Sequence, residues 1–147
     1  MRLRFSITRD VKIPVRAHPT DAGIDFFIPY DVSWDTFSIY PNCSVLIPSG
    51  VKMDIPEGYM LLSLEKSGIA QNGLICGARV VDSGYQGEIH IHIINTGKNP
   101  AVIHAGQKIV QFVLVPILTC EIEEVGEDQL FEYRTNRGSD GFGSTGI

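Results

Sequence analysis

The chain of 147 residues lacks a long hydrophobic run, paired cysteines and a signal peptide. A helix needs roughly 20 apolar residues to cross a bilayer, and no stretch approaches that length, so we expect no membrane span. The N-terminal residues carry arginines but no apolar core with a cleavage site. The cysteines, Cys43, Cys76 and Cys120, are odd in number and widely spaced, which indicates reduced thiols and no zinc motif. We therefore expect a cytoplasmic protein (in the host cytoplasm if the chain is viral or phage-encoded).

Basic charge is also scarce. The 12 Lys and Arg residues stand against 17 Asp and Glu residues, which gives a formal net charge of −5. Binding to nucleic acid without sequence preference depends on a basic surface, so we do not expect nucleic acid as the main ligand. Hydrophobic residues make up 44% and charged residues 20% of the chain, which excludes a disordered protein and is typical of one globular domain.

An amphipathic pattern of helical length is missing too. Apolar and polar residues instead alternate with a period of two over residues 51–55 and 89–93, which predicts strands with one buried face. Residues 109–115 are apolar except for Gln111 and predict a strand covered on both faces. A short helical turn is expected only over residues 67–72. With 15 glycines and eight prolines spread along the chain, this pattern predicts an all-β sandwich, barrel or jelly-roll-like fold.

Several polar residues lie where they could carry chemistry. Asp82 follows an apolar pair and precedes a Ser-Gly turn, so its carboxylate could polarise a water at a strand end or cap its own loop. Asp21 and Asp25 could hold a hydrated cation such as Mg²⁺ or serve a turn. Residues 66–68 could bind phosphate or form a solvated turn. His90 and His92 share one strand face, but no third ligand is evident, so we expect no transition-metal site.

The last stretch, residues 134–147, reads RTNRGSDGFGSTGI and differs in kind from the rest. Composition alone predicts a frayed tail, or else an arm that orders on a ligand. Arg137 offers a planar fork for phosphate oxygens, and Phe142 offers a flat face on which a base could stack. No Lys follows the glycines, so the segment is not a P-loop. An anion site with an aromatic ring suggests a lid over a nucleotide.

Five segments, taken in order, resemble the five motifs of the homotrimeric dUTPases. The resemblance implies an all-β, jelly-roll-like (β-clip) subunit that assembles as a homotrimer with three active sites at subunit interfaces. It also implies a β core over residues 1–132 and a glycine-rich arm over residues 133–147 that closes over the active site. The segments are DAGID (21–25), KSG (66–68), VDSGYQGE (81–88), GQKIVQ (106–111) and RGSDGFGSTG (137–146).

The activity implied by the resemblance is hydrolysis of dUTP to dUMP and pyrophosphate, with Mg²⁺ as cofactor. Such a reaction keeps uracil out of DNA and supplies dUMP for dTMP synthesis. Asp82 matches the carboxylate that orients and activates the water attacking the α-phosphorus in line. Asp25 matches the residue that contacts Mg²⁺ through a bound water. Tyr85 matches the ring beneath the deoxyribose that excludes UTP.

Two groups of substrate contacts follow from the same resemblance. For uracil and deoxyribose, the resemblance implies that Tyr85 packs beneath the sugar, that Phe142 stacks on the uracil, and that the uracil edge meets main-chain groups of Cys76, Val80, Val81 and His90. The residues implied for the triphosphate are Lys66, Ser67, Gly68, Gln111, Arg137, Gly143, Ser144 and Thr145.

The sequence departs from the family pattern at three places. The second motif usually reads Pro-Arg-Ser-Gly, whereas Glu65 and Lys66 stand here; the lysine keeps the charge but loses the bidentate fork, so we expect a weaker grip on phosphate. A glycine usually stands three positions before the catalytic aspartate, and Arg79 stands there instead. Gly84 replaces a usual aspartate, which we expect to be tolerated.

Three other functions are open to the sequence. A dCTP deaminase shares the fold but carries a glutamate where His92 stands and usually Phe or Trp where Tyr85 stands, so deamination is disfavoured. A nucleotide-gated regulatory protein would need a surface for a protein partner, and the aromatic stretch over residues 32–42 is the candidate. An inactive family member is disfavoured because the residues expected nearest the chemistry are present.

Overall fold

The structure of the chain, a computed structural model, describes residues 2–139. These residues form eleven β-strands and one short helix, which confirms the prediction of an all-β protein. In chain order the elements are β1 (Arg4–Ile7), β2 (Gly23–Phe27), β3 (Thr36–Ile39), β4 (Ser44–Pro48), β5 (Val51–Asp54), β6 (Tyr59–Glu65), α1 (Ser67–Gln71), β7 (Leu74–Cys76), β8 (Val80–Asp82), β9 (His90–Asn95), β10 (Ala101–His104) and β11 (Lys108–Pro116).

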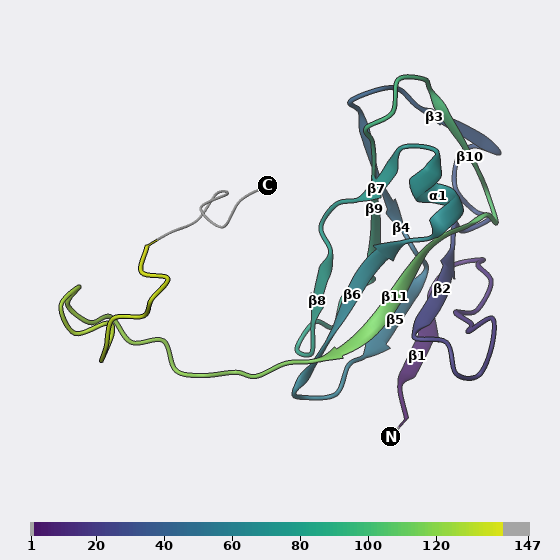
Figure 1. Cartoon of the computed structure of the whole chain (residues 1–147). Helices are drawn as coiled ribbons and strands as arrows, with labels where there is room; N and C mark the ends of the chain where they lie inside the picture. Colours follow the sequence, from purple (N-terminus) through teal and green to yellow (C-terminus); the bar gives the residue numbers. More distant parts are fainter. Residues whose placement is uncertain (1, 140–147) are drawn as a thin grey trace.

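The strands pair into four antiparallel sheets (Figure 1). One sheet has the order β2-β11-β6-β8 and a second has the order β4-β9-β7, while β1 pairs with β5 and β10 with β3. Buried side chains of both larger sheets, such as Phe26 and Leu61 of the first and Ile47 and Ile93 of the second, belong to one hydrophobic core. The two sheets therefore pack face to face around that core.

The predicted period of two is confirmed in the strands that line the core. In β5, Val51 and Met53 are buried while the residues between and after them are exposed. In β9, Ile91 and Ile93 are buried and alternate with His90 and His92 on the other face. Burying one face of a pleated strand in this way provides the apolar area that drives folding.

Strand β11 is an inner strand of the largest sheet and confirms the strand predicted over residues 109–115. It pairs with β2 on one side and with β6 on the other. Its pairing with β2 shifts register between Lys108 and Val110, which is a β-bulge, and bulges re-aim side chains. The rings of Phe26 and Phe112 pack across this pair with centroids 4.5 Å apart.

The helical turn predicted over residues 67–72 is present as α1. At its end, the Asn72 side-chain amide donates a hydrogen bond to the Gly68 carbonyl oxygen over 2.8 Å. Gly73 then adopts a φ of 75° directly against the backbone of Gly97, where a side chain would collide. Among residues 2–139, no helix has the length and apolar content needed to cross a membrane.

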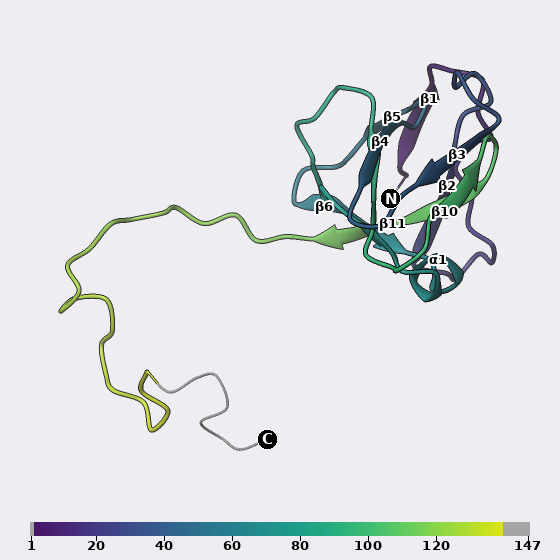
Figure 2. The same cartoon turned by 90° about the horizontal axis from the view of Figure 1, so that it is seen from above.

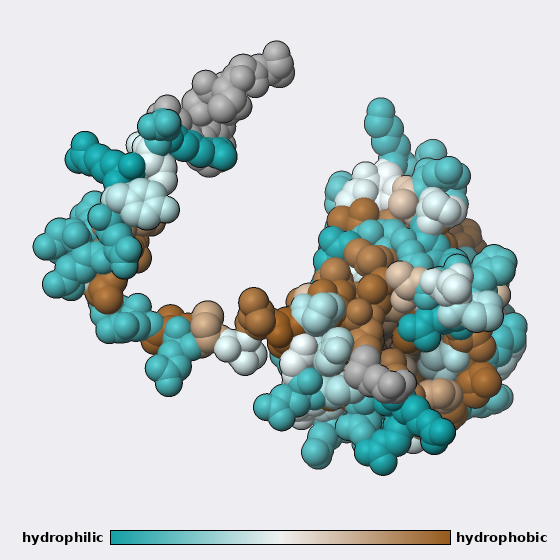
Figure 3. Space-filling model, turned by 60° about the horizontal axis from the view of Figure 1, so that its bottom comes forward, coloured by the Kyte–Doolittle hydropathy of each residue, from teal (hydrophilic) through white to brown (hydrophobic). Residues whose placement is uncertain are grey.

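After β11 the chain leaves the body of the molecule. Residues 117–139, the tail, contain no strand or helix, run outward from the body and then bend through turns (Figures 1 and 2). Large apolar side chains are spaced along it, among them Leu118 and Ile122, which are 99% and 98% exposed (Figure 3). The boundary predicted between residues 132 and 133 falls within this tail, with no change of regular structure to mark it, and stays a prediction.

Shortening Phe112 to alanine is expected to lower the free energy of unfolding by about 3–5 kcal/mol, because the buried ring leaves a cavity beside Phe26. Urea unfolding of both proteins at equal concentration measures the difference. Val102→Ala, on a half-exposed position of β10, serves as the control and should change stability little. Equal losses for the two variants would contradict the placement of Phe112 in the core.

Candidate functional site

The predicted base site lies where one stretch of chain crosses between the two larger sheets. Strand β7 pairs with β9, and the Gly77 N–H donates to the His92 carbonyl oxygen over 2.9 Å. The chain then leaves β9 and joins β6, where the Ser63 N–H donates to the Arg79 carbonyl oxygen over 2.8 Å and Leu62 pairs with Val80. Strands β8 and β9 therefore diverge.

A cavity of about 190 Å³ opens between the diverging strands. Four of the residues predicted to contact uracil and deoxyribose line it, together with the predicted catalytic Asp82. The lining residues are Ala78, Val80, Val81, Asp82, Tyr85, Ile89 and His90.

Cys76 is a predicted base contact that does not line this cavity. The backbone N–H of Cys76 donates to Glu65 Oε1 over 2.7 Å, and the Cys76 side chain is buried in the core. Burial, followed by the nearby Glu65 charge, raises the pKa of the Cys76 thiol to about 11, so the thiol stays protonated at neutral pH. The residue thus fixes the end of β7 and offers no reactive sulfur.

Asp82 is the last residue of β8, as expected from its position after an apolar pair, and its side chain is exposed. The Tyr85 N–H donates to the Asp82 carbonyl oxygen over 3.1 Å and closes the turn. The Tyr85 hydroxyl donates to the Glu88 carbonyl oxygen over 2.9 Å, and its ring lies so close to Gly87 that any side chain there would collide with it. The ring is therefore fixed across the turn next to the Asp82 carboxylate.

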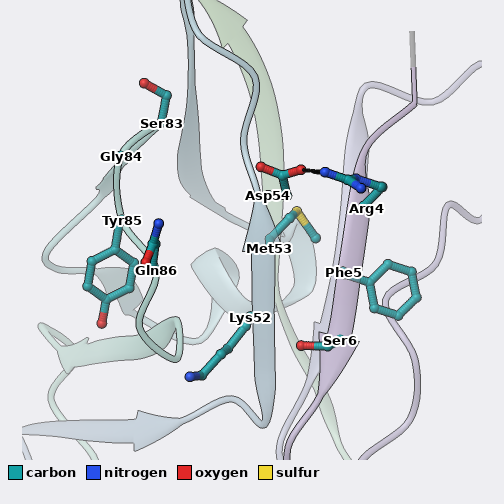
Figure 4. A pocket seen from close by; sticks show the side chains of 10 residues that line it. All are labelled: Arg4, Phe5, Ser6, Lys52, Met53, Asp54, Ser83, Gly84, Tyr85 and Gln86. Atoms are coloured by element: carbon teal, nitrogen blue, oxygen red, sulfur yellow. Dashed lines mark hydrogen bonds and ion pairs between the residues drawn. The ribbon is translucent and has the colours of Figure 1, made fainter.

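A second hollow of about 440 Å³ lies on the other side of this turn (Figure 4). Strands β1 and β5 form one wall, where Arg4 and Asp54 make an ion pair, and residues 83–86 form the other. Tyr85 lines both this hollow and the smaller cavity. The turn that follows Asp82 is thus open on two sides.

The predicted phosphate residues of the body gather in a third cavity of about 400 Å³. The start of α1, with Lys66 before it, and strand β11 each contribute to it. Gln111 is held there, because its side-chain amide donates to the Glu65 carbonyl oxygen over 3.0 Å and its carbonyl lies against Gly23, where a side chain would collide. The lining residues are Lys66, Ser67, Gly68, Ile69, Lys108 and Gln111.

Asp25 carries the negative charge beside this phosphate cavity. Its side chain is only 4% exposed, and its two oxygens contact Lys66 Nζ over 2.5 Å and Lys108 Nζ over 2.8 Å. Burial acts to raise the pKa of Asp25, but the hydrogen bonds and charges of Lys108 and Lys66 outweigh it and lower the pKa. The carboxylate is therefore ionised and holds two cations at the edge of the cavity.

Lys108 is a site residue that the sequence reasoning missed. A single lysine at the start of an apolar strand is typical of a solvated end, and only its membership of the fourth motif hinted at more. The bulge between Lys108 and Val110 lies at the point where its ammonium group reaches Asp25.

Magnesium is predicted to contact the protein through water on Asp25. Among residues 2–139, no group of three or more His, Cys, Asp or Glu side chains could hold a metal ion. A single carboxylate beside a cationic cavity fits an ion held chiefly by substrate phosphates and waters, because Mg²⁺ keeps several waters and often takes few protein ligands.

One chain does not bring Asp82 and the phosphate cavity together. Asp82 pairs with Met60 near the first end of β6, whereas Lys66 follows Glu65 at the other end. Five residues of strand at about 3.4 Å each separate these ends by about 17 Å. The two parts of the predicted site therefore lie at opposite ends of one strand.

The predicted residues of the fifth motif are divided. Arg137 is exposed and lies in the tail that runs away from the body. The remaining four lie outside the described residues: Phe142, Gly143, Ser144 and Thr145.

Comparison with known proteins gives one consistent result. The family model of dUTPase matches residues 9–146. The deoxyuridine 5'-triphosphate nucleotidohydrolase of Corynebacterium jeikeium (strain K411) is 34% identical and covers 96% of this chain and 90% of its own. The enzyme of the same name from Clostridium tetani (strain Massachusetts / E88) is 38% identical and covers 95% of this chain and 92% of its own.

Solved structures agree with these relatives. A mutant dUTPase of Staphylococcus bacteriophage 80alpha with dUpNHpp is similar with a TM-score of 0.84 and 28% identity, over 99% of each chain. A mutant dUTPase from phage phi11 of S. aureus, whose structure describes the coordination of a structural Mg(II) ion, has a TM-score of 0.76 and 27% identity, over 90% of this chain and 100% of that chain. These matches confirm the resemblance found in the five motifs and do not favour a deaminase or a purely regulatory protein. The chain belongs to the dUTPase family and is an enzyme that hydrolyses dUTP.

Proposed function

We propose that this enzyme cleaves dUTP to dUMP and pyrophosphate with a water held by Asp82 in line with the α-phosphorus. Uracil and deoxyribose occupy the cavity between β8 and β9, and the triphosphate occupies a cavity of the kind lined by Lys66, Lys108 and Gln111. The observation that carries the proposal is the exposed Asp82 carboxylate at the rim of the β8–β9 cavity, beside a tyrosine ring fixed across its turn. A positioned carboxylate of this kind can accept the proton of the attacking water.

The same cavity supports selection of the base and the sugar. Val80 and Val81 line the cavity, and β8 is the edge strand of its sheet, so backbone N–H and C=O groups on the edge that faces away from β6 are available to a base. The Tyr85 ring is held across the turn, because its hydroxyl donates a hydrogen bond to the Glu88 carbonyl oxygen. A ribose 2′-hydroxyl would meet this ring, so the enzyme accepts dUTP and rejects UTP.

The ion triad of Asp25, Lys66 and Lys108 supports binding of the triphosphate. Two ammonium groups beside one carboxylate leave the cavity with a net positive charge of one. A Mg²⁺ ion bound with the substrate would supply positive charge that offsets the charge developing on the pyrophosphate leaving group. Asp25 would face the water shell of that ion, and Lys66, which is more exposed than Asp25, would turn from the carboxylate to phosphate oxygens.

We propose a homotrimer as the functional unit, with jelly-roll-like subunits. About 17 Å of strand β6 separates Asp82 from the phosphate loop of the same chain, so a second copy has to supply the phosphate cavity next to each Asp82. The tail adds a second argument, because side chains such as Leu118 and Phe131 are exposed along it and gain apolar contact on another copy. An arm over residues 133–147, with Arg137 and Phe142, would then close over a neighbouring site.

The three cysteines among the described residues are free thiols, which supports a reducing compartment such as the cytoplasm. There the enzyme keeps uracil out of DNA and supplies dUMP. Its proposed partners are dUTP and further copies of the chain.

The variant Asp82→Asn is expected to lower kcat for dUTP by about 10²–10⁴-fold, because the amide keeps the shape of the carboxylate but cannot accept a proton. Binding of dUTP should persist. Pyrophosphate release measures the effect, with UTP, dTTP and dCTP beside dUTP, each with Mg²⁺ and with a chelator. Full turnover by the variant would refute the role of Asp82, and ammonia release from dCTP would favour a deaminase.

Removal of residues 134–147 is expected to leave a folded enzyme with an unchanged number of subunits and little turnover. The body buries its core without these residues, whereas Arg137 and the glycine-rich segment are lost. Light scattering gives the mass, and pyrophosphate release gives the rate. A truncated enzyme with the rate of the full chain would contradict an arm that closes over the site.

The variant Asp25→Asn is expected to lower the free energy of unfolding at pH 7 by about 3 kcal/mol, because it leaves Lys66 and Lys108 without their buried counter-ion. The folded-state pKa of Asp25 lies below its ordinary value of 3.8, so the stabilisation is present above pH 3.8 and is lost as the pH falls through the folded-state pKa.

Urea unfolding at pH 7 and pH 3 measures this difference, which should narrow at the lower pH. Asp54→Asn removes the exposed pair with Arg4 and serves as the matched control, with a much smaller loss at pH 7. A difference between wild type and Asp25→Asn that is the same at both pH values would contradict the ion triad.

A further inference from the structure

Two departures from the family pattern, Glu65 and Arg79, meet in the structure. The Arg79 guanidinium donates from an Nη atom to Glu65 Oε2 over 3.2 Å and from Nε to the Ser63 carbonyl oxygen over 3.2 Å. The Glu65 side chain is only 20% exposed, so the pair is partly shielded from solvent. Neither residue lines the cavity between β8 and β9 or the phosphate cavity.

The pair sits at the crossing where the chain passes from β9 to β6. On one side of the crossing, the Cys76 N–H donates to Glu65 Oε1 over 2.7 Å. On the other side, Arg79 binds Glu65 Oε2. One carboxylate at the end of β6 therefore holds the chain both before and after it changes sheets.

The crossing forms part of the wall of the cavity between β8 and β9. Strand β8 is paired to β6 through only three residue pairs, Met60–Asp82, Leu61–Val81 and Leu62–Val80. The angle at which β8 leaves β9 thus depends on how firmly the crossing is held against β6. Ala78, directly before Arg79, and Val80 and Val81, directly after it, line the cavity, so a shift of the crossing changes the width available to a base.

The charge state of Glu65 suits this role. Burial acts to raise the pKa of the Glu65 carboxyl, but the hydrogen bond from the Cys76 N–H, its own backbone N–H and the Arg79 charge outweigh it and lower the pKa. An ionised carboxylate that accepts one backbone and one guanidinium hydrogen bond forms charge-assisted bonds, which are stronger than neutral ones.

We propose that Glu65 and Arg79 are positioning residues that set the width of the β8–β9 cavity and thereby exclude bases larger than uracil. The proposal rests on the placement of uracil in that cavity. A pocket discriminates against one added methyl group by about 10–200-fold, and only while its walls cannot yield. In this chain the ion pair is the contact that keeps the β8 wall from yielding.

The test is a double-mutant cycle with Glu65→Gln, Arg79→Gly and the two changes together. Glu65→Gln keeps an oxygen for the Cys76 N–H and removes the ion pair. Each variant is assayed for kcat and KM with dUTP and for the inhibition constant of dTTP against dUTP hydrolysis. Every variant retains Asp82, so the ratio of the dTTP inhibition constant to the dUTP KM is measured independently of the Asp82→Asn test.

We expect each single change to lower that ratio about threefold to fivefold, with kcat nearly unchanged. A fold-change of this size corresponds to the free energy that a partly exposed ion pair contributes. The double variant should be no worse than Arg79→Gly, because both changes break the same contact. Arg79→Lys, which keeps the charge but loses the fork, should fall between wild type and Arg79→Gly.

Arg2→Gly removes the same charge at the N-terminal end of the chain and is the control, with an unchanged ratio. A loss of thermal stability with the ratio unchanged in all Glu65 and Arg79 variants would overturn the proposal, since a merely structural pair would behave in that way. Additive effects of the two single changes would overturn it as well.

Discussion

The site depends on one backbone constraint, the crossing of residues 74–82 from the sheet of β9 to the sheet of β6. A strand cannot pair with both neighbours once they diverge, so the chain gives up its hydrogen bonds to β9 after Gly77 and takes up those of β6 at Arg79. The space left between β8 and β9 is the cavity that we propose for the base, and the end of β8 presents Asp82 at its rim. A packed, regular hairpin at this place would have no room for a base.

Strand β6 has the opposite effect, because its rigidity keeps functional groups apart. It joins the Asp82 end of the molecule to the phosphate loop, and a strand of that length cannot fold back on itself. The separation explains why a small chain spreads its motifs from residue 21 to residue 146. The site shared between copies that we propose follows from this separation.

Local patterns predicted the elements of the fold well but not their long-range contacts. Alternation predicted β5 and β9, an apolar run predicted β11, and the Ser-Gly pair predicted α1, because each of these signals lies within a few neighbouring residues. The partners of Asp25 were missed, since Lys66 and Lys108 reach it only after β2, β6 and β11 have paired. Cys76 was predicted to meet the base through its main chain, and that contact stays a prediction, because the burial of its thiol does not test it.

Departures from a family pattern also have to be judged in three dimensions. Considered one at a time along the sequence, Glu65 and Arg79 are two separate departures from the family pattern, one in the second motif and one in the third. In the structure they are one contact, in which the residue that replaces a proline neutralises the residue that replaces a glycine. The large side chain of Arg79 contacts the end of β6 and does not line the cavity between β8 and β9, so it takes up no volume there. A change at one of these positions therefore leaves the charge at the other without its partner in this ion pair.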